Sequence, residues 1–256
     1  MASHPAGRPL PRILHGSAEP VFGVLPETVL ANLRRPSSEN ALLWNLIYPR
    51  ARPSLSLKNL LSLRPMWGTA VLEADDDALT PYFWGFAADG HRLPALAETL
   101  EAVDGAGPST EVDLYLLGKR NLIVIEAKRG SGLGRCGRYE QGVCPHLNPG
   151  SEAEASCRYW DLPAARFDGP LSWTGPPVPG DRPACAVHYQ LGRTLLVGRH
   201  LAQRLDRRLH LWLLAPSSAW SRLQSSWLDF AGAVRQPELW RRLRVLSWES
   251  IAQLPA

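Results

Sequence analysis

One stretch limits the fold of this chain more than any other. Residues 111–128 read EVDLYLLGKRNLIVIEAK, two apolar segments of strand-like composition around a short polar turn. Successive side chains point to opposite faces of a strand, so the position of the turn decides which residues face each other. With the turn centred on Lys119 and Arg120, Asp113 lies opposite Glu126. We therefore expect a β-hairpin whose open end carries two facing carboxylates.

Two carboxylates in this arrangement predict a bound cation. Opposed residues of a hairpin have Cβ atoms roughly 5 Å apart, and two like charges at that spacing repel unless a cation or a proton lies between them. Mg²⁺ takes oxygen ligands, often one or two carboxylates with water and phosphate completing the shell. It polarises a phosphodiester and lowers the pKa of a bound water. Lys128, on the same face as Glu126, would position that water and stabilise transition-state charge.

The scarcity of lysine supports a specific role for Lys128. Of 28 basic residues in the chain only three are lysines, at positions 58, 119 and 128. Arg does not replace Lys where a compact ammonium of adjustable pKa is required. The ordinary alternative is a surface ion pair between Glu126 and Lys128 at a strand end, which contributes little stability. The facing Asp113 argues against that alternative.

These residues resemble the motif of the PD-(D/E)XK nuclease superfamily. Its members have an acidic residue on one strand of a hairpin and (D/E)-x-K on the next, as Asp113 and Glu126-Ala127-Lys128 are placed here. The proline that often precedes the first acid is replaced by Val112. The resemblance implies Mg²⁺ or Mn²⁺ held by Asp113, Glu126 and the backbone carbonyl of Ala127. It assigns activation of the water to Lys128. It also implies a restriction endonuclease-like α/β fold, a three-layer core with a mixed central sheet flanked by helices.

Two further segments add to the resemblance. Many members carry a glutamate on a helix before the sheet, which SSENALLWNL matches and which nominates Glu39. Many also carry a polar residue on the helix after the (D/E)-x-K strand, and HYQLGRTLL nominates Gln190 and, second, Tyr189. These segments, the scattered cysteines and the RYW triplet at 158–160 follow one another along the chain in the same order as in a group of uncharacterised bacterial members. This similarity covers about residues 37–215. Alternatively, Glu39 is an acid in the first turn of a helix that interacts favourably with the helix dipole. Gln190 is alternatively an exposed helix residue.

Four cysteines lie in or just after an irregular stretch of about residues 129–184: Cys136, Cys144, Cys157 and Cys185. Their spacing contains no C-x-x-C pair. A segment this long seldom lacks structure inside a compact domain, so one interpretation is a tetrathiolate centre of Zn²⁺ or an iron–sulfur cluster that orders it. Free or buried thiols are the other interpretation. His146 and His188 are candidate substitute ligands.

Composition bounds the class of protein. A chain of 256 residues that is 45% hydrophobic can bury one core. We expect a Pro-rich leader over 1–36, mobile or loosely docked, and one restriction endonuclease-like domain over 37–256. No apolar run is long enough to span a bilayer and no secretory signal opens the chain, so the expected location is cytoplasmic. Residues 182–256 carry 11 Arg and 4 acids, a net charge of +7 against −3 for the rest, which suits a polyanion such as DNA.

Hydrophobic periodicity gives the remaining elements. It predicts helices over about 38–48, 93–103, 185–209, 218–231 and 237–242, and strands over 68–73, 209–216 and 244–248.

The sequence therefore predicts a metal-dependent deoxyribonuclease. It does not determine the oligomeric state, for which a homodimer is one option. Its predicted catalytic residues are Asp113, Glu126, Lys128, Glu39 and Gln190. The first alternative is a nucleic-acid-binding or scaffold protein of the same fold without turnover. A second is a metal-stapled interaction protein whose hairpin acids pair with the basic C-terminal helices. That last alternative predicts arginine contacts at Asp113 and Glu126.

Overall fold

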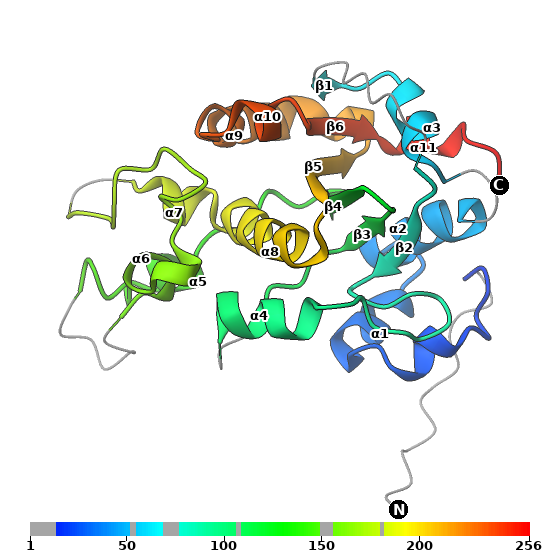
Figure 1. Cartoon of the computed structure of the whole chain (residues 1–256), viewed down its shortest axis with the longest axis horizontal. Helices are drawn as coiled ribbons and strands as arrows, with labels where there is room; N and C mark the ends of the chain where they lie inside the picture. The colour runs from blue at the N-terminus through cyan, green and yellow to red at the C-terminus, as the bar shows by residue number, and fades with distance from the viewer. Residues whose placement is uncertain (1–13, 52–54, 69–76, 106–108, 149–155, 180–181) are drawn as a thin grey trace, which may run out of the picture.

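The computed structural model describes residues 14–51, 55–68, 77–105, 109–148, 156–179 and 182–256. Six strands form one sheet in the order β1-β6-β5-β4-β3-β2. The strands are β1 Trp67–Gly68, β2 Thr80–Phe83, β3 Leu114–Leu117, β4 Asn121–Ala127, β5 Arg208–Ala215 and β6 Leu243–Ser247. β4 runs parallel to β5 and antiparallel to β3, so the sheet is mixed and the fold is α/β (Figure 1).

Helices cover both faces of the sheet and make three layers. One face packs against α4 (Leu96–Asp104), α8 (Tyr189–Leu205) and α9 (Trp220–Gly232). The other packs against α1 (Glu27–Leu33), α2 (Glu39–Ile47), α3 (Leu57–Ser62) and α11 (Trp248–Ala252). Every residue of β4 is buried, since its side chains point alternately into these two layers. Polar groups at the end of β4 therefore lie between α8 on one side and α2 on the other.

The shorter elements connect these layers. They are η1 Pro20–Gly23, η2 Tyr48–Arg50, α5 Gly137–Glu140, α6 Arg158–Asp161, η3 Pro163–Ala165, α7 Ala184–Val187, η4 Ser217–Ala219 and α10 Pro237–Trp240. None of the helices in the described ranges has the length and apolarity needed to cross a bilayer.

The β3–β4 hairpin has the predicted register. Leu117 pairs with Leu122 and Leu114 pairs with Ile125, so Asp113, one residue before β3, is opposite Glu126 (the next pair in that register). The predicted facing of the two acids is therefore confirmed.

Asp77 holds the turn of this hairpin, a role that sequence analysis did not assign. Its carboxylate accepts the backbone N–H groups of Lys119, Arg120 and Asn121 at 2.8, 2.9 and 3.1 Å. Burial by itself would raise the pKa of Asp77, but these hydrogen bonds and one from the Asn121 side chain lower it below the usual value. The three amides would otherwise be unpaired at a tight turn, so Asp77 helps to fix the register.

The predicted helix at 38–48 is confirmed as α2, capped by Ser38, whose hydroxyl accepts the Ala41 N–H at 3.1 Å. The helix predicted to run to 209 is too long by four residues. It ends at Leu205 because Asp206 takes a left-handed conformation with φ 54°, and Leu209 belongs to β5. Sequence analysis missed β2 altogether. In the predicted strand 68–73, residues 69–73 lie outside the described ranges.

Loose docking of the leader is wrong for residues 14–36. This part of the chain contains η1 and α1, and it buries five apolar side chains in the core between the sheet and α2: Leu14, Val21, Leu25, Val29 and Leu33. Its prolines hid this pattern, since Pro26 precedes α1 at the N-cap and Pro20 begins η1. Residues 1–13 lie outside the described ranges.

The cysteine-containing insert is anchored to the core through the RYW triplet. The Tyr159 hydroxyl donates to the buried carboxylate of Asp104 at 2.8 Å, and the Arg158 guanidinium donates to the Asp104 backbone carbonyl at 2.6 Å. Arg193 of α8 approaches the same carboxylate at 3.2 Å. The triplet thus joins the insert to α4 and α8. Figure 1 shows the insert projecting from one end of the sheet.

Candidate functional site

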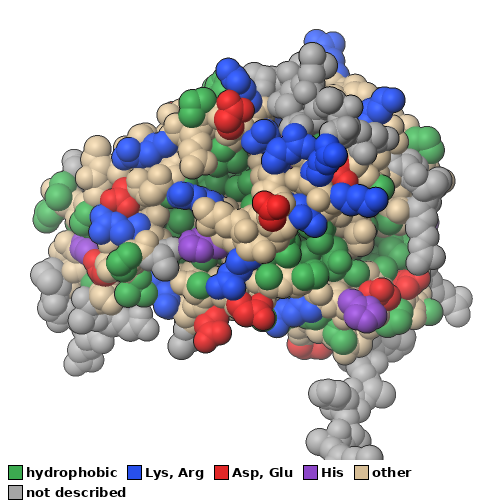
Figure 2. Space-filling view, viewed as in Figure 1, with side chains coloured by type: hydrophobic (Ala, Val, Ile, Leu, Met, Phe, Trp, Pro, Cys, Tyr) green, Lys and Arg blue, Asp and Glu red, His purple; other side chains and the backbone are tan. Residues whose placement is uncertain are grey.

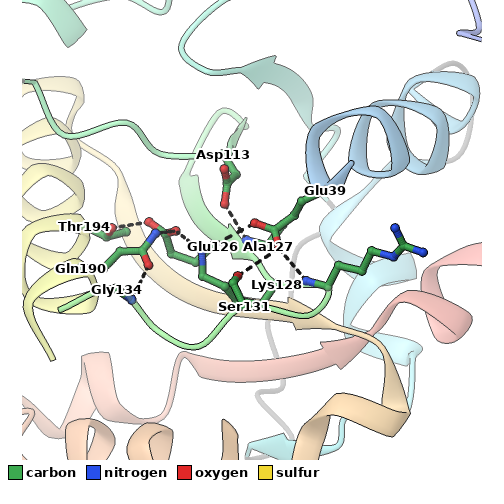
Figure 3. A network of polar contacts seen from close by, with 10 residues as sticks. Glu39, Asp113, Glu126, Ala127, Lys128, Ser131, Gly134, Gln190 and Thr194 are labelled. Atoms are coloured by element: carbon green, nitrogen blue, oxygen red, sulfur yellow. Dashed lines mark hydrogen bonds and ion pairs between the residues drawn. The ribbon is translucent and has the colours of Figure 1, made fainter. Parts of the chain in front are cut away.

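The site lies at the carboxyl end of β4, where the strand leaves the core. Figure 3 shows that all five side chains nominated from the sequence meet there. Asp113 and Glu126 come from the hairpin, Lys128 follows β4, Glu39 comes from the first turn of α2, and Gln190 comes from the first turn of α8. The three helical and strand layers therefore each contribute a residue.

Asp113 is held against the end of β4. Its Oδ2 accepts the backbone N–H of Ala127 at 2.8 Å. Burial raises the pKa of Asp113 to about 6, and the positive charge of Lys128 and the Ala127 hydrogen bond only partly oppose this. The negative charges of Glu39 and Glu111 raise the pKa of Asp113 further.

Glu126 is fully buried and uses both of its oxygens. The Thr194 hydroxyl donates to Oε1, and Gln190 Nε2 donates to Oε2 at 2.7 Å. Burial raises the pKa of Glu126 to about 8, the charge of Asp113 raises it further, and the positive charge of Lys128 opposes the shift. In the metal-free state, the pair formed by Asp113 and Glu126 therefore retains a proton near neutral pH.

Lys128 is the cation of the cluster. Its Nζ lies 3.7 Å from Glu39 Oε1 and 3.9 Å from Glu126 Oε2. Only 6% of the residue is exposed. Burial alone would lower the pKa of Lys128, but Glu126, Asp113 and Glu39 together raise it above the usual value. The ammonium therefore stays charged, and the burial of both Lys128 and Glu126 is incompatible with a simple surface ion pair at a strand end.

Glu39 connects α2 to the loop after β4. Its Oε2 accepts the Arg129 backbone N–H at 2.6 Å and lies 3.5 Å from the Ser131 hydroxyl, while its Oε1 faces Lys128. A favourable interaction with the α2 dipole explains an acid in this turn but not these contacts. Glu39 is thus a third carboxylate beside the facing pair.

Gln190 links the site to the insert, because its Oε1 accepts the Gly134 backbone N–H at 2.9 Å. Tyr189, the second nomination, does not reach the site. Its ring packs edge-on against Tyr159, and the Arg193 guanidinium lies 5.2 Å from its centroid. Neighbouring residues on a helix point in different directions, so only one of the two could face β4.

Sequence analysis missed Thr194, which lies one helical turn after Gln190 on the same face of α8. The signal was present as Gln-x-x-x-Thr ahead of an apolar run. We expect Thr194→Val to weaken Mg²⁺ binding about 10-fold, in the range seen when a hydrogen-bonding partner of a metal ligand is removed. The Thr194 hydrogen bond lowers the pKa of Glu126, so its loss favours the protonated carboxyl, which cannot bind metal. Isothermal titration with Mg²⁺ at pH 8 measures this effect.

Thr194→Ser is the matched control, because it keeps the hydroxyl and should retain wild-type affinity. Equal Mg²⁺ affinity for the Val and Ser variants would contradict a role of Thr194 in positioning Glu126.

The oxygen atoms of the two facing carboxylates are ligands of the kind that a hard cation prefers. Across the described ranges, no group of three or more His, Cys, Asp or Glu side chains is arranged to hold a metal ion by itself. Mg²⁺ does not require such a cage, since it is commonly bound through one or two carboxylates and keeps several waters. Glu126 is buried and Asp113 half-buried, and both have raised pKa values because ionising the two together is opposed by their mutual repulsion, which a cation would remove.

None of the four cysteines, all of which lie in the described ranges, forms a disulfide bond. Burial raises the pKa of Cys157 to about 12, and the other three cysteines add to that shift, so all four are within electrostatic range of one another. The Cys136 N–H donates to the Ala186 carbonyl at 2.9 Å, beside Cys185. The side chains do not converge as ligands. His146 instead lies 3.5 Å from Asp161. A metal centre and free thiols both remain predictions.

The acids of the hairpin do not pair with the basic C-terminal helices. Within the part of the chain that the structure describes, Asp113 and Glu126 contact each other and the side chains of Gln190, Thr194 and Lys128, and none of these is an arginine. The arginine contacts required by the interaction-protein alternative are therefore not seen.

Comparison of the chain with known protein families, with curated proteins and with solved structures finds no match in any of the three. The cluster itself combines two facing carboxylates, a third carboxylate from α2, a charged lysine and an amide that bridges to the insert.

Proposed function

We propose that the chain is a metal-dependent deoxyribonuclease of the PD-(D/E)XK superfamily, with the restriction endonuclease-like form of the α/β fold. One observation carries the proposal. Half-buried Asp113 and buried Glu126 face each other, and Lys128 Nζ lies 3.9 Å from the Glu126 carboxylate. Two carboxylates this close repel each other when both are ionised, and a divalent cation bound between them would remove that repulsion.

In this proposal, Asp113, Glu126 and the Ala127 carbonyl would hold Mg²⁺ or Mn²⁺. The ion supplies Lewis-acid stabilisation of the phosphodiester and lowers the pKa of a bound water. Lys128, charged and fixed by Glu39, orients that water by hydrogen bonding and balances negative charge in the transition state. Gln190 and Thr194 keep Glu126 in one rotamer. DNA as substrate is supported by the +7 charge of residues 182–256 and by the Lys and Arg side chains gathered on the face in Figure 2.

The test is a cleavage assay on single- and double-stranded DNA, linear and circular, with Mg²⁺, Mn²⁺ or a chelator. We expect cleavage that requires the metal and falls by at least 100-fold in Asp113→Asn, because that variant lacks one ligand and its charge. Glu98→Gln, an exposed acid on α4, is the control and should match wild type. DNA binding without any cleavage by the wild-type protein would instead favour the binding or scaffold alternative.

A further inference from the structure

A cavity outside the carboxylate cluster is lined by residues of the insert and of two helices. It has a volume of about 550 Å³ and is bounded by the insert, the start of α8 and one side of α9. We call it the α8–α9 cavity. The polar residues that line it include Arg135 and Arg182 of the insert, His188 before α8 and Asp229 of α9. Trp173 supplies much of its apolar wall.

His188 gives this cavity an unsatisfied polar group. The residue is only 6% exposed. Among the described residues, its Nδ1 is buried without a hydrogen-bond partner. Its ring stacks on Trp173, with centroids 6.3 Å apart and planes at 27°, so packing fixes the imidazole. A buried polar group without a partner is unfavourable, and the rest of the His188 side chain lines the cavity.

The charges around His188 favour an anion. Arg135 and Arg182 are both exposed and line the cavity, and Arg135 also lies 3.5 Å from Glu140. The 17-residue helix α8 begins at the cavity, so the positive end of its dipole points toward it. Asp229 opposes these charges as one carboxylate. Two guanidinium groups, a helix N-terminus and an imidazole together match the chemistry of a phosphate group.

The cavity and the carboxylate site are connected through residues that are neighbours along the chain. Gly134 donates to Gln190, which in turn donates to Glu126. Arg135 is the next residue after Gly134, and His188 is two residues before Gln190. A strand bound at the carboxylates would therefore place a neighbouring phosphate near this cavity.

We propose that the α8–α9 cavity binds a phosphate group of the nucleic-acid strand held at the carboxylate site. The inference rests on the proposed nuclease function and goes beyond it by assigning the grip on the strand to Arg135, Arg182 and His188. The phosphate is either an internal phosphodiester or the terminal phosphate of a strand.

The test measures binding without turnover, in the Lys128→Ala background. Fluorescence anisotropy of a labelled 30-nucleotide strand, with or without a 5′-phosphate, is followed against KCl concentration. For Arg135→Ala/Arg182→Ala we expect about 10-fold weaker binding at 0.1 M salt, and a salt slope reduced by about one for each phosphate that the variant no longer neutralises. Better binding of the 5′-phosphorylated strand assigns a terminal phosphate, and equal binding of the two strands assigns an internal one.

The double variant Arg64→Ala/Arg204→Ala is the control, because it removes the same number of positive charges as the cavity variant. Both residues are exposed and neither lines the cavity. Arg204 lies 16 residues beyond His188 on α8, about 24 Å along the helix. Equal loss of binding in the two double variants, or no loss in the cavity variant, would overturn the inference. A wild-type protein that binds DNA but never cuts it would sink the nuclease proposal while leaving this comparison intact.

A second measurement uses inorganic phosphate alone. At constant ionic strength, phosphate should shift the His188 imidazole signals in a ¹H–¹³C spectrum and leave those of His91 unchanged, because His91 is exposed and remote from α8. His188 signals that do not respond to phosphate at millimolar concentration would also count against the proposal.

Discussion

Lys128→Ala is expected to lower the rate of metal-dependent cleavage by about 10³-fold, within the range for loss of a group that stabilises transition-state charge. The wild-type ammonium is 6% exposed and lies within 4 Å of two carboxylates, so a water that enters the variant cannot replace its charge. Because Lys128 repels a bound cation, metal affinity should stay equal or rise. Single-turnover cleavage and Mg²⁺ titration separate the two effects.

Lys128→Arg should recover little of this activity. The site accommodates a compact ammonium, and the planar guanidinium needs more room between Glu39 and Glu126. Lys119→Ala is the matched control: it removes another of the three lysines, from the exposed turn of the same hairpin. Its backbone amide still binds Asp77, and activity should match wild type. Cleavage by Lys128→Ala within threefold of wild type would refute the assigned role.

The second large effect is on stability. Without metal, we expect the free energy of unfolding to fall by on the order of 7 kcal/mol between pH 4 and pH 8.5, since both pKa values are raised by folding and one unit of pKa shift corresponds to about 1.4 kcal/mol. Folding raises the pKa of Asp113 to about 6 and that of Glu126 to about 8. The folded protein therefore keeps protons that the unfolded chain has released. The stabilisation is complete below the unfolded pKa values and is lost as pH rises through 6 and then 8.

Glu126→Gln should flatten this pH profile, because the amide keeps the hydrogen-bonding shape and cannot ionise. Mg²⁺ should stabilise the wild-type protein more at pH 8.5 than at pH 5.5, since protons compete with the metal for the same oxygens. Urea unfolding at a series of pH values, with and without Mg²⁺, provides both comparisons. Parallel profiles for wild type and Glu126→Gln would mean that the carboxylate does not carry the raised pKa.

The hairpin and its register were predictable because they depend on local alternation. Asp113 and Glu126 are 13 residues apart in the chain, and the position of the turn alone decides their pairing. The capped helix α2 was predictable for the same reason, through Ser38 and the following apolar residues. The α/β class and the mixed sheet follow from the order of such elements.

Features that depend on distant contacts were not predictable from the pattern. The position of Glu39 beside Lys128 requires α2 to pack under the end of β4. The choice of Gln190 over Tyr189, and the role of Thr194, depend on the rotation of α8 about its axis. Asp77 was missed because its partners are backbone amides more than 40 residues away, which leave no trace in side-chain composition.

The order in which these contacts can form has a consequence for the newly made chain. The carboxylate pair belongs to one hairpin and can form as soon as residues 111–128 leave the ribosome. Glu39 reaches the Arg129 amide across 90 positions, and Gln190 reaches Glu126 across 64. Contacts of such separation form late in folding. A nascent or partly unfolded molecule would thus have the two facing carboxylates without the groups that orient them, and the proposed cleavage of DNA would wait until the whole domain had closed.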